Sequence, residues 1–381
     1  MNILIAADIF PPSVGGPATY SFLLLRELSS MGYTISILTL TPKRLPHEPA
    51  GVFRVIHSFF PLRYFEYYRL LKKHGQGVDI IYAMGPVNAG LPALFVARAL
   101  RKPLVVKVVG DYAWEQGVAR FGVKELPDEF QHKRYGLRVS MLRWIEQFVC
   151  KRARAVVVPS EYLKKIVMGW GVSAESVHVI YNAAPNVHAQ SSETLPSVLQ
   201  NRKIIFSAGR LMPWKGMQTL VEIMPELVAH DSSLHLVIAG SGPEKETLVE
   251  LVKKLKLEHA VTLLGKVEAG DMQAWFQQAH VFVLNSGYEG MAHTILEAFA
   301  YGCPVVASNT CGNPELVAHE KTGLLCEYND AVGLKKAIIR LVADQDLRGV
   351  CITHAKEKMA LLSQKNMLEN TINLLKRFVR E

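Results

Sequence analysis

The chain has 381 residues, a length that predicts two domains rather than one. With 49% hydrophobic and 20% charged residues, the composition excludes a disordered or low-complexity protein. The net charge is +9 and uneven: residues 1–190 hold 23 Lys and Arg against 13 Asp and Glu, whereas residues 191–381 hold 20 against 21.

Short apolar runs alternate with amphipathic helical stretches along the whole chain. Runs rich in Val, Ile and Leu that are separated by helices predict parallel sheets covered on both faces. Helices are expected, for example, over 18–30 and 137–152. The strands expected in the N-terminal half are 3–7, 34–40, 80–83, 104–109 and 155–158. Those expected in the C-terminal half are 203–207, 234–239, 261–264, 281–284 and 304–307.

The polar segment 185–202 interrupts this pattern. It contains paired serines and two prolines and has no clear period, so it predicts an interdomain linker. We expect an α/β protein with two doubly wound, Rossmann-like domains, 1–188 and 189–365, and a C-terminal helix over 366–381 that packs on the first domain. Ligands of open parallel sheets bind beyond the carboxyl ends of the strands, so two facing domains would place the site in a central cleft.

The loop after the first strand carries Gly15 and Gly16 just before a helix. Paired glycines let the backbone approach a ligand closely, and a helix N-terminus favours an anion; a flexible turn is the ordinary alternative. The loop lacks the dinucleotide fingerprint G-x-G-x-x-G, and no carboxylate follows the second strand to hold a ribose. A nicotinamide-dependent dehydrogenase is therefore disfavoured.

Two cations follow the first strand of the C-terminal half. Arg210 comes soon after the strand 203–207, and Lys215 precedes Gly216 and a helix. The planar fork of Arg and the point charge of Lys suit a diphosphate. The alternative is that both are solvated loop residues.

The most informative segment follows the strand 281–284. Glu289 lies in the loop, and Glu297 lies eight residues later in the helix that the loop opens. Carboxylates accept hydrogen bonds from hydroxyl groups, so two at this spacing can hold the two ends of one elongated ligand. Gly290 and the helix start near Ala292 add a surface that tolerates an anion. The alternative is a turn residue followed by a helix-surface charge.

Five short motifs then occur along the chain in one order. They are Gly-Gly-x-x-x-Tyr at 15–20, Ala-Gly-Arg-x-x-x-x-Lys-Gly at 208–216, Gly-Ser-Gly-Pro at 240–243, Glu-x7-Glu at 289–297 and Ala-Tyr-Gly-Cys-Pro-Val-Val-Ala at 300–307. Together they resemble the retaining glycosyltransferases of family 4, which have the GT-B fold. The resemblance runs from the first strand to 322–325 and therefore covers most of the chain.

The resemblance implies roles for the site residues. Arg210 and Lys215 would neutralise the diphosphate of a nucleotide-sugar, Glu297 would hold the ribose, and Glu289 would hold hydroxyls of the transferred sugar. The glycine pair would border the diphosphate from the opposite domain. The expected catalytic set is Arg210, Lys215, Glu289 and Asp111. The expected donor-binding set is Gly15, Gly16, Gly240, Gly290, Met291, Ala292, His293, Thr294 and Glu297.

The resemblance also implies the mechanism. No metal and no cofactor are expected, because the two cations would replace a metal electrostatically. Retention without an evident nucleophile fits a front-face reaction, in which an oxygen of the leaving diphosphate takes the proton of the acceptor hydroxyl.

Three positions depart from the family pattern. Gly110-Asp111 stands where many members carry His-Asp, so a His that touches the donor is absent, although Asp111 can still face the cleft. Tyr-Asn-Ala-Ala at 181–184 replaces Pro-Asn-Gly-x-Asp, and Gly-Met-Ala-His at 290–293 replaces Gly-Phe-Gly. His293 is expected either to contact the donor or to be a hydrogen-bonded structural residue. Because of these departures, the motifs do not identify the donor sugar.

Cysteine usage and hydropathy indicate the compartment. The five cysteines form no C-x-x-C pair, which argues against a disulfide framework or a zinc site and suits a reducing cytosol. No secretory leader is recognised. The longest uncharged stretch, 80–97, is interrupted by Gly and Pro and does not predict a membrane span. We expect a cytoplasmic protein, either free or peripheral on the inner face of the membrane.

Aromatic and basic residues interleave in two segments of the N-terminal half, 59–73 and 133–154. This mixture suits an anionic membrane or a lipid-diphosphate acceptor, and no RNA- or DNA-binding module is evident. A packed helix with a solvated basic edge is the alternative. Because the N-terminal domain of GT-B enzymes usually holds the acceptor, the resemblance implies a glycan or lipid-linked acceptor there.

The sequence thus predicts an enzyme that transfers mannose or glucose from GDP-mannose or a UDP-sugar to such an acceptor. Two alternatives stay open. A sugar-nucleotide epimerase of the same fold would convert the donor alone, and a non-catalytic protein would bind the donor without turnover.

Overall fold

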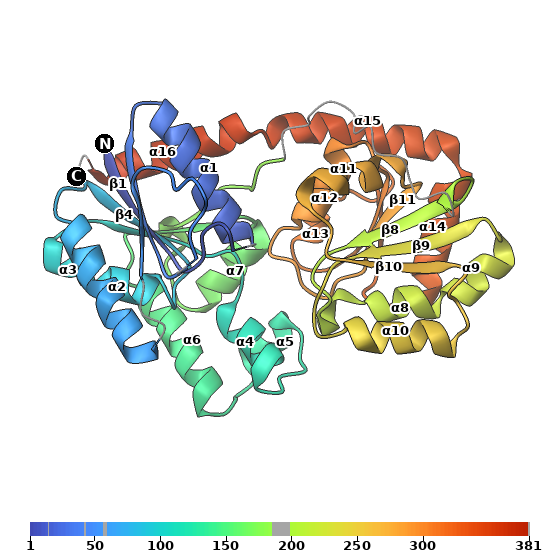
Figure 1. The fold of residues 1–381 in the computed structure, drawn as a ribbon, viewed down its shortest axis with the longest axis horizontal. Coiled ribbons are helices and arrows are strands. Elements are labelled where there is room, and N and C mark those ends of the chain that lie inside the picture. Colours follow the sequence, from blue (N-terminus) through green and yellow to red (C-terminus); the bar gives the residue numbers. More distant parts are fainter. Residues whose placement is uncertain (14, 42, 56–58, 185–198, 380–381) are drawn as a thin grey trace. The chain divides into compact units, whose positions relative to one another are not determined.

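The computed structural model describes residues 1–379 except 14, 42, 56–58 and 185–198. It comprises two compact units: Met1–Tyr181 with Lys365–Glu381, and Asn182–Gln364 (Figure 1). The predicted boundary at residues 188 and 189 and most of the predicted linker lie outside the described residues.

The first unit is built on a seven-stranded parallel sheet with the order β3-β2-β1-β4-β5-β6-β7. Its strands are β1 (Asn2–Ala7), β2 (Thr34–Thr39), β3 (Val52–Arg54), β4 (Ile80–Met84), β5 (Leu104–Lys107), β6 (Ala155–Val158) and β7 (Val177–Val179). Every residue of β4, β5 and β6 is buried, as expected for strands with helices on both faces.

Helices cover both faces of this sheet. They are α1 (Gly16–Ser30), α2 (Phe60–His74), α3 (Gly90–Leu100), α4 (Tyr112–Arg120), α5 (Pro127–His132), α6 (Leu137–Cys150), α7 (Glu161–Gly169), the short η1 (Ala174–Ser176) and α16 (Gln364–Val379). The predicted C-terminal helix is α16, and it belongs to this unit. It buries residues that recur at helical spacing, such as Leu368, Ile372 and Leu375. Its Thr371 hydroxyl lies 3.2 Å from the Tyr20 hydroxyl of α1.

The second unit is built on a six-stranded parallel sheet with the order β10-β9-β8-β11-β12-β13. Its strands are β8 (Lys203–Ala208), β9 (Leu234–Ala239), β10 (Val261–Gly265), β11 (Val281–Leu284), β12 (Val305–Ser308) and β13 (Leu324–Cys326). Successive residues Ile204 and Ile205 of β8 belong to different hydrophobic clusters, because side chains alternate between the two faces of a strand.

The elements around this sheet complete a doubly wound fold. They are η3 (Pro213–Lys215), α8 (Met217–Glu222), α9 (Met224–His230), α10 (Lys245–Lys254), α11 (Ala269–Gln278), α12 (His293–Ala300), α13 (Asn313–Leu316), α14 (Ala331–Ala343) and α15 (Gln345–Leu361). All the predicted strands are present, and the predicted α/β class with two parallel sheets is confirmed. Strands β3, β7 and β13 were not predicted: each has three residues and lies at a sheet edge.

Candidate active site

The order of the second sheet places its switch point between β8 and β11. The chain runs outward from β8 through β9 to β10 on one side, and from β11 through β12 to β13 on the other. In open parallel sheets, the point where the direction reverses is where ligands bind, beyond the carboxyl ends of the strands. The loops after β8 and β11 carry Lys215 and Glu289, so the predicted cations and carboxylates lie at this point.

Three contacts join these two loops. Lys215 Nζ lies 2.5 Å from Glu289 Oε1, and both side chains are about 15% exposed. The Gly287 amide donates to the Trp214 carbonyl over 2.7 Å, and the Asn285 side-chain amide donates to the Gly216 carbonyl over 3.0 Å. A diphosphate at this edge would compete with Glu289 for the Lys215 ammonium. The geometry therefore brings together two groups for which the sequence implied separate roles.

Asn285 connects the loops at this switch point. It is fully buried directly after β11, and its side-chain amide also donates to Asn329 Oδ1 over 2.8 Å. Its Oδ1 accepts from the Asn329 amide at 2.9 Å, and the Thr219 hydroxyl donates to Asn329 Oδ1 over 2.8 Å. A buried amide that is fully hydrogen-bonded holds its neighbours in one arrangement. Asn329 was not predicted from the sequence, although the position of Asn285 after a strand was a signal.

Gly216 permits this arrangement. Its φ is 59°, and a Cβ atom there would lie 2.1 Å from the Asn285 carbonyl oxygen. The turn that presents Lys215 therefore needs both the left-handed conformation and the missing side chain.

Replacing Gly216 with Ala should destabilise the second unit by roughly 2–4 kcal/mol, the sum of backbone strain and a forced shift of β11. Calorimetric melting would measure the loss. Gly302→Ala is the matched control, because Gly302 also has a positive φ but its nearest neighbour to a Cβ is 3.9 Å away. Equal melting temperatures for the two variants would contradict the close approach.

The loop between β11 and α12 is hydrogen-bonded to residues at the end of β12 and just after it. The hydroxyls of Ser308 and Thr310 donate to the Ser286 carbonyl over 2.5 and 2.9 Å. The Gly312 amide donates to the Glu289 carbonyl over 3.0 Å. These bonds fix the backbone of the loop, so Glu289 is presented by a rigid support rather than by a free turn.

Glu297 lies on α12 with a different environment. It is half-buried, and its carboxylate has no hydrogen bond or ion pair to the residues that the structure describes. Burial raises the pKa of Glu297 to about 7. A carboxylate that is partly desolvated and unpartnered is well suited to accept hydrogen bonds from a ligand's hydroxyl groups.

The start of α12 contains the remaining predicted donor-binding residues of this segment. Gly290, Met291 and Ala292 are buried, and the helix cap at Ala292 supplies no side-chain hydrogen bond to the first backbone N–H groups. His293 is exposed, and its Nε2 lies 3.1 Å from the Asn182 side-chain amide. This contact favours the structural alternative for His293. Thr294 follows in the first turn and is half-buried.

Arg210 and Gly240 follow neighbouring strands. Arg210 is exposed, and its guanidinium bonds to none of the described residues. Gly240 follows β9 with φ 151°, and a Cβ there would lie 1.8 Å from the Gly209 carbonyl oxygen. The loops after β8 and β9 approach so closely that no side chain fits at position 240, which explains why a glycine is present. A donor-binding role for Gly240 stays a prediction.

The remaining predicted residues belong to the first unit. Gly15 is the N-cap of α1 and Gly16 is its first residue, and no side-chain hydrogen bond caps this end of the helix. Asp111 is 1% exposed and caps α4: it accepts from the Trp114 amide at 2.8 Å and from Gln131 at 2.7 Å. Burial raises its pKa. These contacts give Asp111 an architectural role, and the catalytic role predicted for it gains no support from them.

Two family models match the chain, one in each half. The model of Glycosyltransferase Family 4 matches residues 14–185, and that of Glycosyl transferases group 1 matches residues 193–358. An alpha-monoglucosyldiacylglycerol synthase of Streptococcus pneumoniae is 24% identical over 96% of this chain and 83% of its own length. A GDP-mannose-dependent alpha-(1-6)-phosphatidylinositol monomannoside mannosyltransferase of Mycobacterium tuberculosis is 34% identical over 39% of this chain and 40% of its own length. Several further relatives are matched over little more than half of their length.

The fold is shared with solved structures. Anabaena HepE in complex with UDP and glucose superposes with a TM-score of 0.75 at 19% identity, over 99% of this chain and all of that one. The two family matches together run through both units. The chain therefore belongs to the glycosyltransferases of family 4, enzymes of the GT-B fold that use a nucleotide-sugar donor.

Proposed function

We propose that this enzyme transfers a hexose from UDP-glucose or GDP-mannose to a lipid-linked acceptor, with retention of configuration and without a metal. The observation that carries the proposal is the Lys215–Glu289 pair at the switch point of the second sheet. Glu297, whose carboxylate bonds to none of the described residues, lies on the helix α12 that follows the Glu289 loop. By their names, the Streptococcus pneumoniae relative synthesises a monoglucosyl lipid and the Mycobacterium tuberculosis relative transfers mannose to a mannosyl lipid, and HepE holds UDP and glucose.

The proposed reaction needs few groups from the protein. The bond between the anomeric carbon and the diphosphate oxygen breaks, and the acceptor hydroxyl attacks the same face of that carbon. A diphosphate oxygen takes the proton of the hydroxyl. Lys215 and Arg210 stabilise the charge that develops on the leaving diphosphate, which lowers the barrier because they are already in place. Glu297 holds the ribose, and Glu289 orients the sugar.

A donor panel tests the proposal. UDP-glucose, GDP-mannose and ADP-glucose would each be assayed for binding and for slow release of the nucleoside diphosphate, with and without a chelator. We expect one donor to bind and to hydrolyse at a rate that the chelator leaves unchanged. Conversion of the donor to an epimer without diphosphate release, or binding without any turnover, would overturn the proposal.

We further propose that the enzyme binds an anionic membrane through the outer surface of α2, α3 and α6. In the first unit, α3 contacts both α2 and α6, so the three helices form one layer. Large apolar side chains are exposed on it, with Leu137 86% and Phe65 61% exposed. The set is Leu62, Phe65, Phe95, Leu137, Met141 and Trp144.

Exposed basic side chains lie on the same helices as this apolar set. We name the two sets together the α2–α3–α6 surface. The basic set, on these helices or just after them, consists of Arg69, Lys72, Lys73, Arg98, Arg138, Lys151 and Arg152. On α6, Trp144 stacks on Phe148, over which the Arg152 guanidinium lies at 4.0 Å. Apolar side chains among cations match the boundary of an anionic bilayer. Among the described residues, none of the helices combines the length and apolar content that crossing a membrane requires.

The double variant Leu137→Gln, Trp144→Gln should bind vesicles of phosphatidylcholine and phosphatidylglycerol roughly tenfold or more weakly than the parent, because each apolar side chain loses its burial in lipid. Sedimentation would measure this, and binding should fall as salt increases. Met31→Gln is the control, since Met31 is exposed in the same unit but lies at the end of α1. Equal losses in both variants would argue against this surface.

A further inference from the structure

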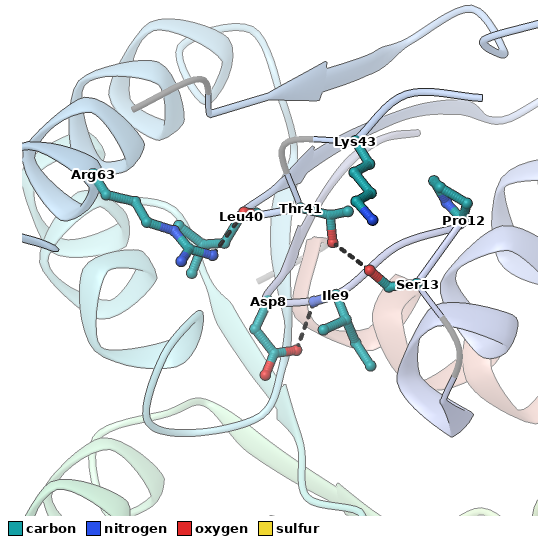
Figure 2. A pocket seen from close by; sticks show the side chains of 8 residues that line it. All are labelled: Asp8, Ile9, Pro12, Ser13, Leu40, Thr41, Lys43 and Arg63. Atoms are coloured by element: carbon teal, nitrogen blue, oxygen red, sulfur yellow. Dashed lines mark hydrogen bonds between the residues drawn. The ribbon is translucent and has the colours of Figure 1, made fainter. Parts of the chain in front are cut away.

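The first unit contains a pocket of about 440 Å³ at the carboxyl ends of β1 and β2 (Figure 2). Its volume is in the range of small-molecule sites. Residues after both strands and one residue of α2 line it. They are Asp8, Ile9, Pro12, Ser13, Leu40, Thr41, Lys43 and Arg63.

A buried arginine outside the pocket holds its walls together. The Arg54 side chain is 2% exposed and pairs with Glu48 at 2.7 Å. It donates to the Pro11 carbonyl over 2.7 Å and to the Thr41 carbonyl over 3.2 Å. The Thr41 hydroxyl in turn accepts from the Phe10 amide at 3.0 Å. One guanidinium thus ties the loop after β1 to the loop after β2, so the pocket is preformed.

The charged side chains of the pocket leave it positive. Figure 2 shows Arg63 donating to the Leu40 carbonyl, a bond of 2.7 Å that uses one of its five N–H donors. Lys43 is exposed at the same pocket and forms no ion pair with described residues. Asp8 is the single carboxylate among the lining residues, and burial raises its pKa, although Asn88, the Ile9 amide and Arg63 act in the opposite direction.

The side chains that line the pocket indicate which class of ligand it would bind. The cations suit a phosphate, for which the Arg63 fork and the Lys43 point charge are complementary donors. The Asp8 carboxylate and the hydroxyls of Ser13 and Thr41 suit the hydroxyl groups of a polyol. Ile9, Pro12 and Leu40 offer apolar contact for its carbon skeleton.

We propose that this pocket binds a phosphate-bearing polyol, which is the part of the acceptor that carries the attacking hydroxyl. This inference rests on the proposed transferase function and names its acceptor class. The polyol phosphate is either a soluble molecule or the head group of a phospholipid, and the chemistry of the pocket is the same for both.

Binding to the full-length protein tests the ligand class. Calorimetry with sn-glycerol 3-phosphate and myo-inositol 1-phosphate should show binding at least tenfold tighter than with glycerol and myo-inositol. Arg63→Gln and Lys43→Gln should each weaken binding of the phosphates at least tenfold, and Arg63→Lys should lose less. Lys165→Gln, an exposed cation on α7 that makes the same charge change, should bind as the parent does. Melting temperatures would show that each variant is folded.

A transfer assay with a labelled nucleotide-sugar donor distinguishes a soluble acceptor from a lipid head group. Transfer to the soluble phosphates identifies a free acceptor, and transfer only to phosphatidylinositol or phosphatidylglycerol in vesicles identifies a lipid head group; both support the proposal. It is overturned if phosphates bind no better than the neutral polyols, or if the Arg63 and Lys43 variants bind as the parent does. Donor hydrolysis by the parent without acceptor tests the transferase function separately, because its absence would overturn that function whatever the pocket binds.

Discussion

Replacing Lys215 with Gln should reduce kcat/KM for sugar transfer roughly 100- to 1,000-fold, by analogy with removal of one oxyanion donor. The effect should fall mainly on kcat, because the negative charge on the leaving diphosphate is larger in the transition state than in the bound donor. Release of the nucleoside diphosphate, measured over a range of donor concentrations, separates kcat from KM.

The Lys215 variant also leaves Glu289 without its ion pair. A matched control is Lys266→Gln, which breaks an exposed Lys–Glu pair with Glu268 in the same unit. Exposed pairs contribute little, so activity and melting temperature should stay near those of the parent. If Lys215→Gln lowers kcat no more than this control does, Lys215 does not stabilise the leaving group.

Replacing Glu297 with Gln should weaken binding of the nucleotide-sugar by roughly 1.5–3 kcal/mol, the contribution of hydrogen bonds to a charged group. The parent should also bind in a pH-dependent way. Burial raises the pKa of Glu297 to about 7, and ribose hydroxyls that donate to the carboxylate would favour its charged form. Affinity should therefore rise with pH up to about 7 and fall about tenfold per pH unit below it.

Calorimetry with UDP-glucose and GDP-mannose between pH 5.5 and 8 measures this profile, because their phosphates do not titrate in that range. The Glu297→Gln variant should lose the pH dependence, and Glu258→Gln, an exposed carboxylate of the same unit, should keep it. If the affinity of the parent protein for the donor does not change across this pH range, Glu297 does not hold the ribose.

Stability gives a second readout for the same residue. A folded pKa above the ordinary 4.5 means that the folded chain binds the proton more tightly than the unfolded chain. The ionised side chain therefore costs stability in full above about pH 7, and the cost disappears below about pH 4.5. Glu297→Gln should raise the melting temperature of the second unit at pH 8 and leave it unchanged near pH 4.5.

The strands were predictable because their signal is local. The predicted strands are short runs rich in Val, Ile, Leu and Ala, and some of them, such as β6 and β11, are buried throughout. The missed strand β3 has three residues, two of them only partly buried, so its pairing with β2 rather than its own composition makes it a strand. The C-terminal segment shows the same limit, since the pattern of α16 predicts a buried face without naming its partner.

The site residues, too, differ in whether a local sequence signal or only a long-range contact reveals them. The motifs placed Lys215, Glu289 and Glu297 after strands or in the helix that follows, where ligands of parallel sheets bind. The hub of Asn285, Asn329 and Thr219 escaped notice because its members are 44 and 110 residues apart in the chain. For Asp111, the catalytic role implied by the resemblance stays a prediction, and the structure adds its burial and its cap contacts, which the sequence did not indicate.

By itself, the sequence determined two parallel α/β sheets, the family and the loops that carry its motifs, because apolar periodicity and motif spacing are properties of neighbouring residues. Only the tertiary structure decided that Lys215 pairs with Glu289, 74 residues away, and that Arg54 closes a cationic pocket around Asp8 and Arg63. These contacts depend on strand order and on the burial of charged groups. Both are set by packing across the whole sheet, which no short stretch of sequence encodes.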